Sequence, residues 1–263
     1  MVLLGVMLSN TNSINSENEV INICYYNESG KEEIINEINT YRDEAKAAFL
    51  PRFFKTGKGE YGEGDLFIGV VVPNLRVVAK KHFDADFDTL RELLASPYHE
   101  YRLTALLALT YRYAKFKDLA SREACVNFYV SQVDAINNWD LVDLSCYKIL
   151  GHWLFDKDKQ LLYDWAKEDH LWKQRIAMIT CMHFVKQGEF KDALAIADLL
   201  QHHPHDLIHK AVGWILREIG KEDEQLLVDY LTPRYKEMPR TMLRYAIERF
   251  EEGKRKAFLH SKV

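Results

Sequence analysis

The stretch YRLTALLAL (residues 101–109) sets a pattern that WDLVDLSCY (139–147), QRIAMITCM (174–182) and KAVGWILRE (210–218) repeat. Aligned on Arg102, Asp140, Arg175 and Ala211, these stretches follow one another at intervals of 38, 35 and 36 residues. A period near 40 with two helices per repeat is typical of HEAT-like and armadillo-like stacks, whose neighbouring repeats share one core. The sequence therefore predicts an all-α fold, an α-solenoid that forms a superhelix of paired helices.

The segment SPYHEYRLTALLALTYRY (96–113) indicates how one of these helices begins. Ser is a preferred N-cap residue and Pro is favoured at the first helical position, so we expect Ser96 and Pro97 to take these places. The spacing of the leucines that follow predicts one buried face, formed by Leu103, Leu106 and Leu107.

One segment departs from the helical pattern. The β-branched run in GDLFIGVVVP (64–73) is typical of a strand and could pair briefly. Because Pro is favoured at helix starts, Pro73 is more consistent with opening a helix over NLRVVAKKH (74–82). We therefore expect a helix over residues 74–82 rather than a sheet built on residues 64–73.

Composition divides the chain of 263 residues into three parts. Residues 1–30 are rich in Asn and Ser without helical periodicity, and we expect an N-terminal extension. Residues 31–252 carry the helical repeats. Residues 253–263 include Lys254, Arg255, Lys256 and Lys262 and predict a basic C-terminal tail, with a solvated terminal helix as the alternative.

Membrane-spanning, signal-peptide and CxxC patterns are each missing from the sequence, which bears on the location of the protein and the state of its cysteines. No apolar run approaches the ~20 residues that span a bilayer, and MVLLGVML is a poor signal peptide, so we expect a cytoplasmic protein without membrane association. The cysteines form no CxxC pair and predict buried free thiols rather than a metal site: Cys24, Cys125, Cys146 and Cys181.

Trp139 and Asp143 form the first candidate for a functional site. They lie four residues apart in a predicted helix, so an aromatic plane and a carboxylate share one face. This pairing suits a flat cationic substrate. The alternative for the pair taken alone is a solvated carboxylate beside a Trp that packs in the core.

Helical phase extends this candidate to two more repeats. In 210–218 and the residues after it, the buried stripe consists of Val212, Ile215, Leu216 and Ile219, and Trp214 projects away from it at ~100° per residue. Arg175 lies beside a stripe formed by Trp172, Ile176, Ile179 and His183, and Asp143 beside one formed by Val142, Cys146, Ile149, Leu150 and Trp153. Aligned repeats would bring these polar and aromatic residues to one groove.

The sequence resembles the AlkD-like DNA alkylation repair family, the HEAT-repeat DNA glycosylases. The resemblance rests on WDLVD (139–143), WKQR (172–175), KAVGWILRE and FIGVVVPNLR (67–76, with Gly69, Pro73 and Arg76), and covers roughly residues 31–250. It implies that Asp143 is the catalytic carboxylate, that Trp139 and Trp214 cradle the backbone of the lesion, and that Arg175 binds phosphate.

The implied reaction is hydrolysis of the N-glycosidic bond of positively charged N3- or N7-alkylated purines in double-stranded DNA, without flipping the base into a pocket. Asp143 would stabilise the cationic sugar of the transition state, with cation–π support from the two Trp rings. Lys210 and Arg217 would hold phosphates together with Arg175. We expect a monomer without metal or cofactor, associated with the nucleoid when bound to DNA. The alternative is a non-catalytic HEAT-like scaffold that binds DNA or a protein.

Two further motifs carry less weight. Gly57, Gly59 and Gly62 match GxGxxG but follow the end of a predicted helix and lie among acidic residues that would repel a pyrophosphate. HHPHD (202–206) invites a metal site, but Pro204 is expected to begin a helix and separate the histidines, which favours a polar turn.

Overall fold

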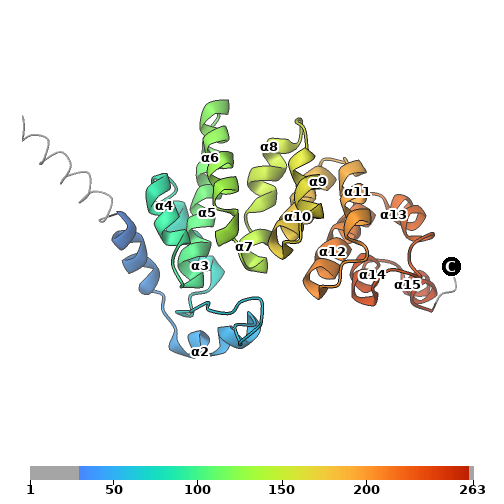
Figure 1. The fold of residues 1–263 in the computed structure, drawn as a ribbon, viewed down its shortest axis with the longest axis horizontal. Coiled ribbons are helices and arrows are strands. Elements are labelled where there is room, and N and C mark those ends of the chain that lie inside the picture. The colour runs from blue at the N-terminus through green and yellow to red at the C-terminus, as the bar shows by residue number, and fades with distance from the viewer. Residues whose placement is uncertain (1–29, 261–263) are drawn as a thin grey trace, which may run out of the picture. The chain divides into compact units, whose positions relative to one another are not determined.

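The computed structural model describes residues 30–260, and within them the chain is helical apart from one isolated bridge between Leu66 and Tyr98 (Figure 1). The all-α prediction is confirmed. The chain divides into two compact units, Met1–Tyr111 and Arg112–Val263. The predicted N-terminal extension lies outside the described residues except for Gly30. No helix in the described part of the chain is long and apolar enough to cross a bilayer.

In the N-terminal unit, residues 30–39 are helical and four named helices follow. Asp43 and Asp86 act as N-caps, because their carboxylates accept from the backbone N–H groups of Lys46 and Thr89. The helices are α2 (Glu44–Phe53), α3 (Val72–Lys81), α4 (Phe87–Leu94) and α5 (His99–Lys115), within which the boundary between the units falls.

The segment before α3 forms a partly buried loop, with one isolated bridge at Leu66. Gly69 has a φ of +83°, and a Cβ there would lie 2.0 Å from the Asp43 carbonyl oxygen, so only glycine fits. The carboxylate of Glu100 accepts from the backbone N–H groups of Ile68, Gly69 and Val70. Pro73 lies in the first turn of α3, which confirms that it opens this helix.

The start of α5 differs from the sequence prediction. The helix begins at His99, so the placement of Pro97 at its first position is wrong. The carbonyl of Pro97 accepts from Leu66 N–H, and His99 N–H donates to the Leu66 carbonyl, which holds residues 97–98 extended. Leu103, Leu106 and Leu107 are buried, as expected, but all residues from 99 to 110 are buried, so this part of α5 is covered on every side rather than on one face.

The C-terminal unit consists of helices in a stack, each packed on the next. Helix α10 (Leu171–Lys186) contacts α7 (Trp139–Asp143) and the π-helix η2 (Tyr147–Gly151) on one side and α12 (Asp206–Glu222) on the other (Figure 1). Helix α12 in turn contacts α14 (Arg240–Ala246). The remaining elements are α6 (Leu119–Ser131), η1 (Val133–Ala135), α8 (His152–Leu154), α9 (Gln160–Lys167), α11 (Lys191–Leu200), α13 (Glu224–Leu231) and α15 (Glu252–Leu259).

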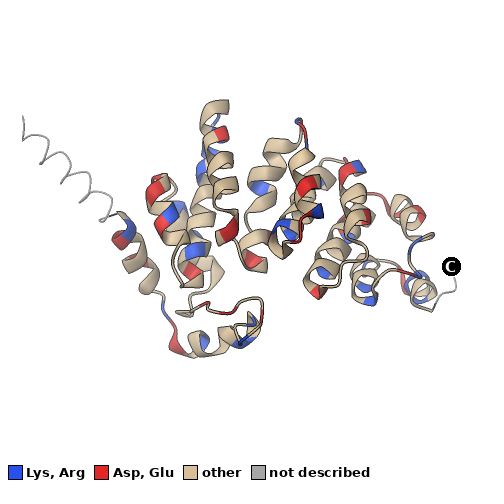
Figure 2. Ribbon diagram, viewed as in Figure 1, with Lys and Arg blue, Asp and Glu red and all other residues tan. Residues whose placement is uncertain are grey.

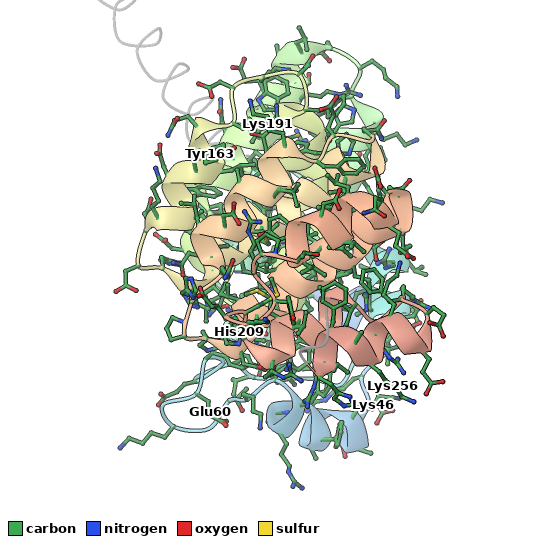
Figure 3. All side chains as sticks on the ribbon, turned by 90° about the vertical axis from the view of Figure 1, so that its right-hand side faces the viewer. Lys46, Glu60, Tyr163, Lys191, His209 and Lys256 are labelled. Atoms are coloured by element: carbon green, nitrogen blue, oxygen red, sulfur yellow. The ribbon has the colours of Figure 1, made fainter. Side chains whose placement is uncertain are left out.

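Helices α9 and α11 lie beside this stack and contact one another. The Tyr163 hydroxyl of α9 donates to Asp192 of α11 at 2.7 Å. Figure 3 shows Tyr163 and Lys191 near each other and well away from His209 of α12. The succession of a stacked helix and a partner beside it gives the α-solenoid-like architecture that the repeats predict.

Glycines allow the stacked helices to approach closely. A Cβ at Gly151 would lie 2.6 Å from the His183 Cβ, and a Cβ at Gly213 would lie 2.5 Å from the Tyr245 Cβ. Any larger residue would separate η2 from α10 or α12 from α14. These two glycines therefore allow the close contacts of η2 with α10 and of α12 with α14.

Helical phase was predicted well in α12 and less well around η2. Val212, Ile215, Leu216 and Ile219 are fully buried, as expected, whereas Trp214 is partly buried rather than exposed. Val142, Cys146, Ile149 and Leu150 are also fully buried, but Trp153 is only partly so. The wider turn of η2 carries one extra residue, which rotates Trp153 off the stripe.

The C-terminal residues do not form a simple tail. Residues Glu252–Leu259 form α15, and Phe258 is buried against Tyr235 and Phe250 at ring distances of 5.3 and 5.7 Å. Three of the cysteines, Cys125, Cys146 and Cys181, are buried free thiols as predicted, and Cys24 lies outside the described residues.

Candidate active site

Asp143 and Arg175 form a two-point ion pair across the contact between α7 and α10. Arg175 Nε donates to Asp143 Oδ1 at 2.9 Å, and Arg175 Nη2 donates to Asp143 Oδ2 at 2.7 Å. This parallel arrangement is the strongest geometry for a carboxylate and a guanidinium. The carboxylate is thus held in one orientation at the last residue of α7.

The ion pair lies largely out of water. The side chains of Asp143 and Arg175 are 12% and 6% exposed. Burial raises the pKa of Asp143 above its usual range, the positive charge of Arg175 opposes this shift, and Asp140 nearby adds to it. The two hydrogen bonds from Arg175 favour the ionised carboxylate and so act against this effect of burial.

Arg175 also reaches the next helix in the stack. Its Nη1 donates to the backbone carbonyl of Leu207, in the first turn of α12. One side chain therefore joins α7, α10 and α12. The hydrogen bonds use three of the five N–H groups of the guanidinium, so one on each terminal nitrogen remains for another acceptor.

These contacts join residues 32 apart, Asp143 to Arg175 and Arg175 to Leu207. The sequence repeats have steps of 35 and 36 residues in this region. The difference is about one turn of helix, so neighbouring helices are offset along their axes by about one turn. This offset brings Asp143, rather than Asp140, opposite Arg175.

Trp139 lies one turn before Asp143, at the first residue of α7. The side chain of Asn138, which is fully buried, accepts from the Trp139 backbone N–H at 2.8 Å and caps the helix. Trp139 itself is partly buried. The i, i+4 relation therefore holds in the structure, with the indole on the same helical face as the ion pair.

Trp214 shares a partly buried face of α12 with the two predicted phosphate-binding residues. Leu207, Lys210, Trp214 and Arg217 are spaced by three or four residues, which aligns them along one side of the helix. This face starts at the carbonyl that accepts from Arg175. Trp214 therefore lies two turns after Leu207, the residue whose carbonyl is hydrogen-bonded to Arg175.

Like Arg175, the other two residues predicted to bind phosphate already have acidic partners. Lys210 Nζ lies 2.7 Å from the carboxylate of Asp206, and Arg217 pairs with Glu248 and lies 3.7 Å from Glu218. Figure 2 shows basic and acidic positions interspersed along the helices, in keeping with the net charge of −4. A phosphate at either residue would have to replace a carboxylate.

The histidines of HHPHD form a turn that caps α12. The helix begins at Asp206 and not at Pro204, so that prediction is wrong. His205 Nδ1 accepts from Leu207 N–H at 3.1 Å, and His203 Nε2 is hydrogen-bonded to Gln174 Oε1 at 2.9 Å. In the described part of the chain, no group of three metal-binding side chains is present here or elsewhere.

In the GxGxxG segment, two glycine backbone amides are hydrogen-bonded to glutamate side chains. Glu60 accepts from Gly57 N–H at 2.8 Å and Glu63 accepts from Gly59 N–H at 2.7 Å. The amides that a phosphate would need are therefore bound to carboxylates, which supports setting this motif aside.

A stack of paired helices with a buried ion pair of Asp143 and Arg175 characterises a helical-repeat protein with a candidate acid site. Residues 34–250 match the sequence profile described as DNA alkylation repair enzyme, so the chain belongs to the DNA alkylation repair family.

The fold is similar to that of a solved structure described as a predicted DNA alkylation repair enzyme from Enterococcus faecalis, with a TM-score of 0.61. The two sequences are 16% identical, and the superposition covers 80% of this chain and 97% of the other. At this identity the likeness concerns the fold. Among curated proteins, no relative matches this chain.

Proposed function

We propose that this protein is a DNA glycosylase that hydrolyses the N-glycosidic bond of positively charged N3- or N7-alkylated purines in double-stranded DNA. Membership of the DNA alkylation repair family supports a role in DNA repair. The observation that carries the glycosylase proposal is the buried two-point pair of Asp143 and Arg175, with Trp139 one turn away on the same face.

The chemistry suits a fixed carboxylate. Alkylation at N3 or N7 makes the purine cationic and a good leaving group, so the main barrier is formation of the positively charged sugar. A carboxylate offers about four acceptor positions, and Arg175 uses two of those on Asp143. The remaining positions can face the sugar C1′ or orient the attacking water. A preorganised charge in a buried site lowers such a barrier by several kcal/mol.

The other site residues take supporting roles in this proposal. The indoles of Trp139 and Trp214 give cation–π contacts to the electron-poor sugar. Arg175 positions Asp143 and offers its remaining N–H groups to a phosphate, while Lys210 and Arg217 exchange their carboxylate partners for phosphates. The protein would act as a monomer, in the cytoplasm and at the nucleoid, without metal or cofactor.

Release of free base tests the proposal directly. Duplex DNA methylated at N7 of guanine or N3 of adenine is incubated with excess protein, and the released base is separated and quantified. We expect release above the spontaneous rate from methylated duplex and none from undamaged duplex. Binding of the duplex without any release would instead support the non-catalytic scaffold, in which the ion pair only joins two helices.

A further inference from the structure

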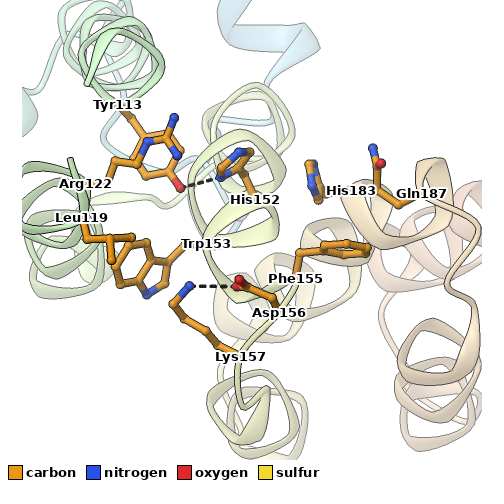
Figure 4. A pocket seen from close by; sticks show the side chains of 10 residues that line it. All are labelled: Tyr113, Leu119, Arg122, His152, Trp153, Phe155, Asp156, Lys157, His183 and Gln187. Carbon is orange, nitrogen blue, oxygen red and sulfur yellow. Dashed lines mark hydrogen bonds and ion pairs between the residues drawn. The ribbon is translucent and has the colours of Figure 1, made fainter. Parts of the chain in front are cut away.

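A cavity lies at the other end of α10 from the candidate active site. It has a volume of about 560 Å³ and opens between α6, α8 and the C-terminal part of α10 (Figure 4). His183, on its wall, follows Arg175 by eight residues, which is about 12 Å along the helix. The cavity is therefore separate from the Asp143–Arg175 pair.

The floor of the cavity is aromatic. Trp153 and Phe155 both contribute to its lining, and Phe155 meets the His183 ring edge-on at 5.7 Å. Lys157 lies 4.3 Å from the centre of the Trp153 ring. Such a surface favours a flat, weakly polar group.

Arg122 supplies a positive charge, with the carboxylate of Asp118 one turn earlier as an electrostatic neighbour. Its Nε donates to the Phe116 carbonyl at 2.9 Å, and its guanidinium lies over the Tyr113 ring at 5.5 Å. Among the described residues it makes no ion pair, and its terminal nitrogens have no hydrogen-bond partner. Lys157, in contrast, is paired with Asp156 at 2.8 Å. The cavity therefore contains a guanidinium whose terminal nitrogens are open to a ligand.

Two imidazoles complete the polar side. His152 Nδ1 is hydrogen-bonded to the Tyr113 hydroxyl at 2.8 Å, and the rings of His152 and His183 lie 5.4 Å apart (Figure 4). Burial raises the pKa of Tyr113 to about 12, so its hydroxyl is protonated and can donate to His152. The ring nitrogens of His183 have no hydrogen-bond partner in the described structure. The imidazole N–H groups of His152 and His183 can donate hydrogen bonds to a bound anion.

We propose that this cavity binds a phosphomonoester carried on a planar heterocycle, for which a nucleoside 5′-monophosphate is the fitting class. Arg122 would hold the phosphate through its two free terminal nitrogens, and His152 and His183 would donate to the remaining oxygens. The heterocycle would lie on Trp153 and Phe155. The volume falls within the range of sites for small ligands.

Calorimetric titration tests this proposal with the whole protein and four probes: deoxyadenosine 5′-monophosphate, deoxyadenosine, inorganic phosphate and a short 5′-phosphorylated single strand. We expect the monophosphate to bind at least tenfold more tightly than the nucleoside or phosphate alone. Equal affinity for inorganic phosphate would overturn the role of the ring. Tighter binding of the strand than of the monophosphate would overturn a free nucleotide as the occupant, and no binding of the monophosphate would overturn the site.

Three variants locate the binding. Arg122→Gln should weaken binding of deoxyadenosine 5′-monophosphate by about tenfold or more, since a charge-assisted hydrogen bond is lost. Trp153→Leu should also weaken it, and both variants should leave release of methylated base unchanged. Arg249→Gln, at an exposed arginine outside the cavity, is the matched control. An equal loss in that control, or full affinity in Arg122→Gln and Trp153→Leu with unchanged unfolding midpoints, would contradict the assignment.

Discussion

Arg175 holds both carboxylate oxygens of Asp143 and, through a third hydrogen bond, the carbonyl of Leu207. The residue predicted as a phosphate ligand is thus first of all the support of the predicted catalytic acid. Stability and catalysis should therefore respond together when this pair is changed.

Asp143→Asn should reduce single-turnover release of methylated base by on the order of a hundredfold or more, because the negative charge opposite the cationic sugar is lost. The amide still offers one acceptor to Arg175, so the stability cost should be about 1–3 kcal/mol. Asp134→Asn, at an exposed acid of η1, is the control. An unchanged rate in Asp143→Asn would remove this residue from the mechanism.

Arg175→Ala leaves a buried carboxylate unpaired and should lower the free energy of unfolding by about 3–5 kcal/mol. The double variant Asp143→Asn with Arg175→Ala should lose less than the sum of the two single changes, because the amide needs no counter-ion. Denaturant unfolding of all four proteins gives the coupling energy. If the losses in free energy of unfolding are additive, the interaction between Asp143 and Arg175 does not contribute to stability.

Lys210→Ala and Arg217→Ala should weaken binding to methylated and undamaged duplex alike, since phosphate contacts do not distinguish the bases. Each change should reduce the slope of log affinity against log salt concentration by about 1. Lys191→Ala on α11, an exposed lysine away from α12, provides the control. Wild-type affinity and slope in both α12 variants would place the phosphates elsewhere.

Trp214→Ala should impair release of methylated base yet destabilise the protein less than Ile215→Ala, because Trp214 is partly buried and Ile215 fully so. Truncation of a fully buried Ile costs about 2–5 kcal/mol. Unfolding midpoints and single-turnover rates for both variants make the comparison. If Trp214→Ala is the more unstable protein with a normal rate, the indole is a packing residue.

Acid should destabilise the C-terminal unit below about pH 6.5. Burial lowers the pKa values of His152, His183, His203 and His205 from the ordinary value of 6.5, so the folded protein takes up protons less readily than the unfolded chain. Stability is therefore complete above pH 6.5 and is lost as the pH falls towards the folded pKa values. Thermal unfolding between pH 5 and 8 measures this, and His183→Gln should flatten the curve.

The repeating core could be read from the sequence because its period is regular. Val212, Ile215, Leu216 and Ile219 follow the helical period without interruption, and all four are buried. The start of α5 could not be predicted from the sequence. Its position depends on a hydrogen bond between Leu66 and Pro97, which are far apart in the chain. The tertiary hydrogen bond outweighs the local preference of Pro97 for the first position of a helix.

The sequence proposes the members of the candidate site but not the contacts between them. Trp139 and Asp143 share a face because their spacing along one helix decides it. The pairing of Asp143 with Arg175 depends on the offset between two helices, which no single stretch of sequence encodes. The cavity around Trp153 was not predicted for a related reason, since one extra residue in η2 changes the phase of the short helix His152–Leu154 that follows it.

The π-helix η2 gives the protein an unusual route for change during evolution. Loss of one codon among residues 147–151 would restore an ordinary helix and turn His152 and Trp153 by ~100° with respect to Asp143. No single-residue exchange can make that rotation. One in-frame deletion or insertion here would therefore reorient two residues of the cavity wall, while Asp143, which precedes η2 in the chain, kept its place in α7.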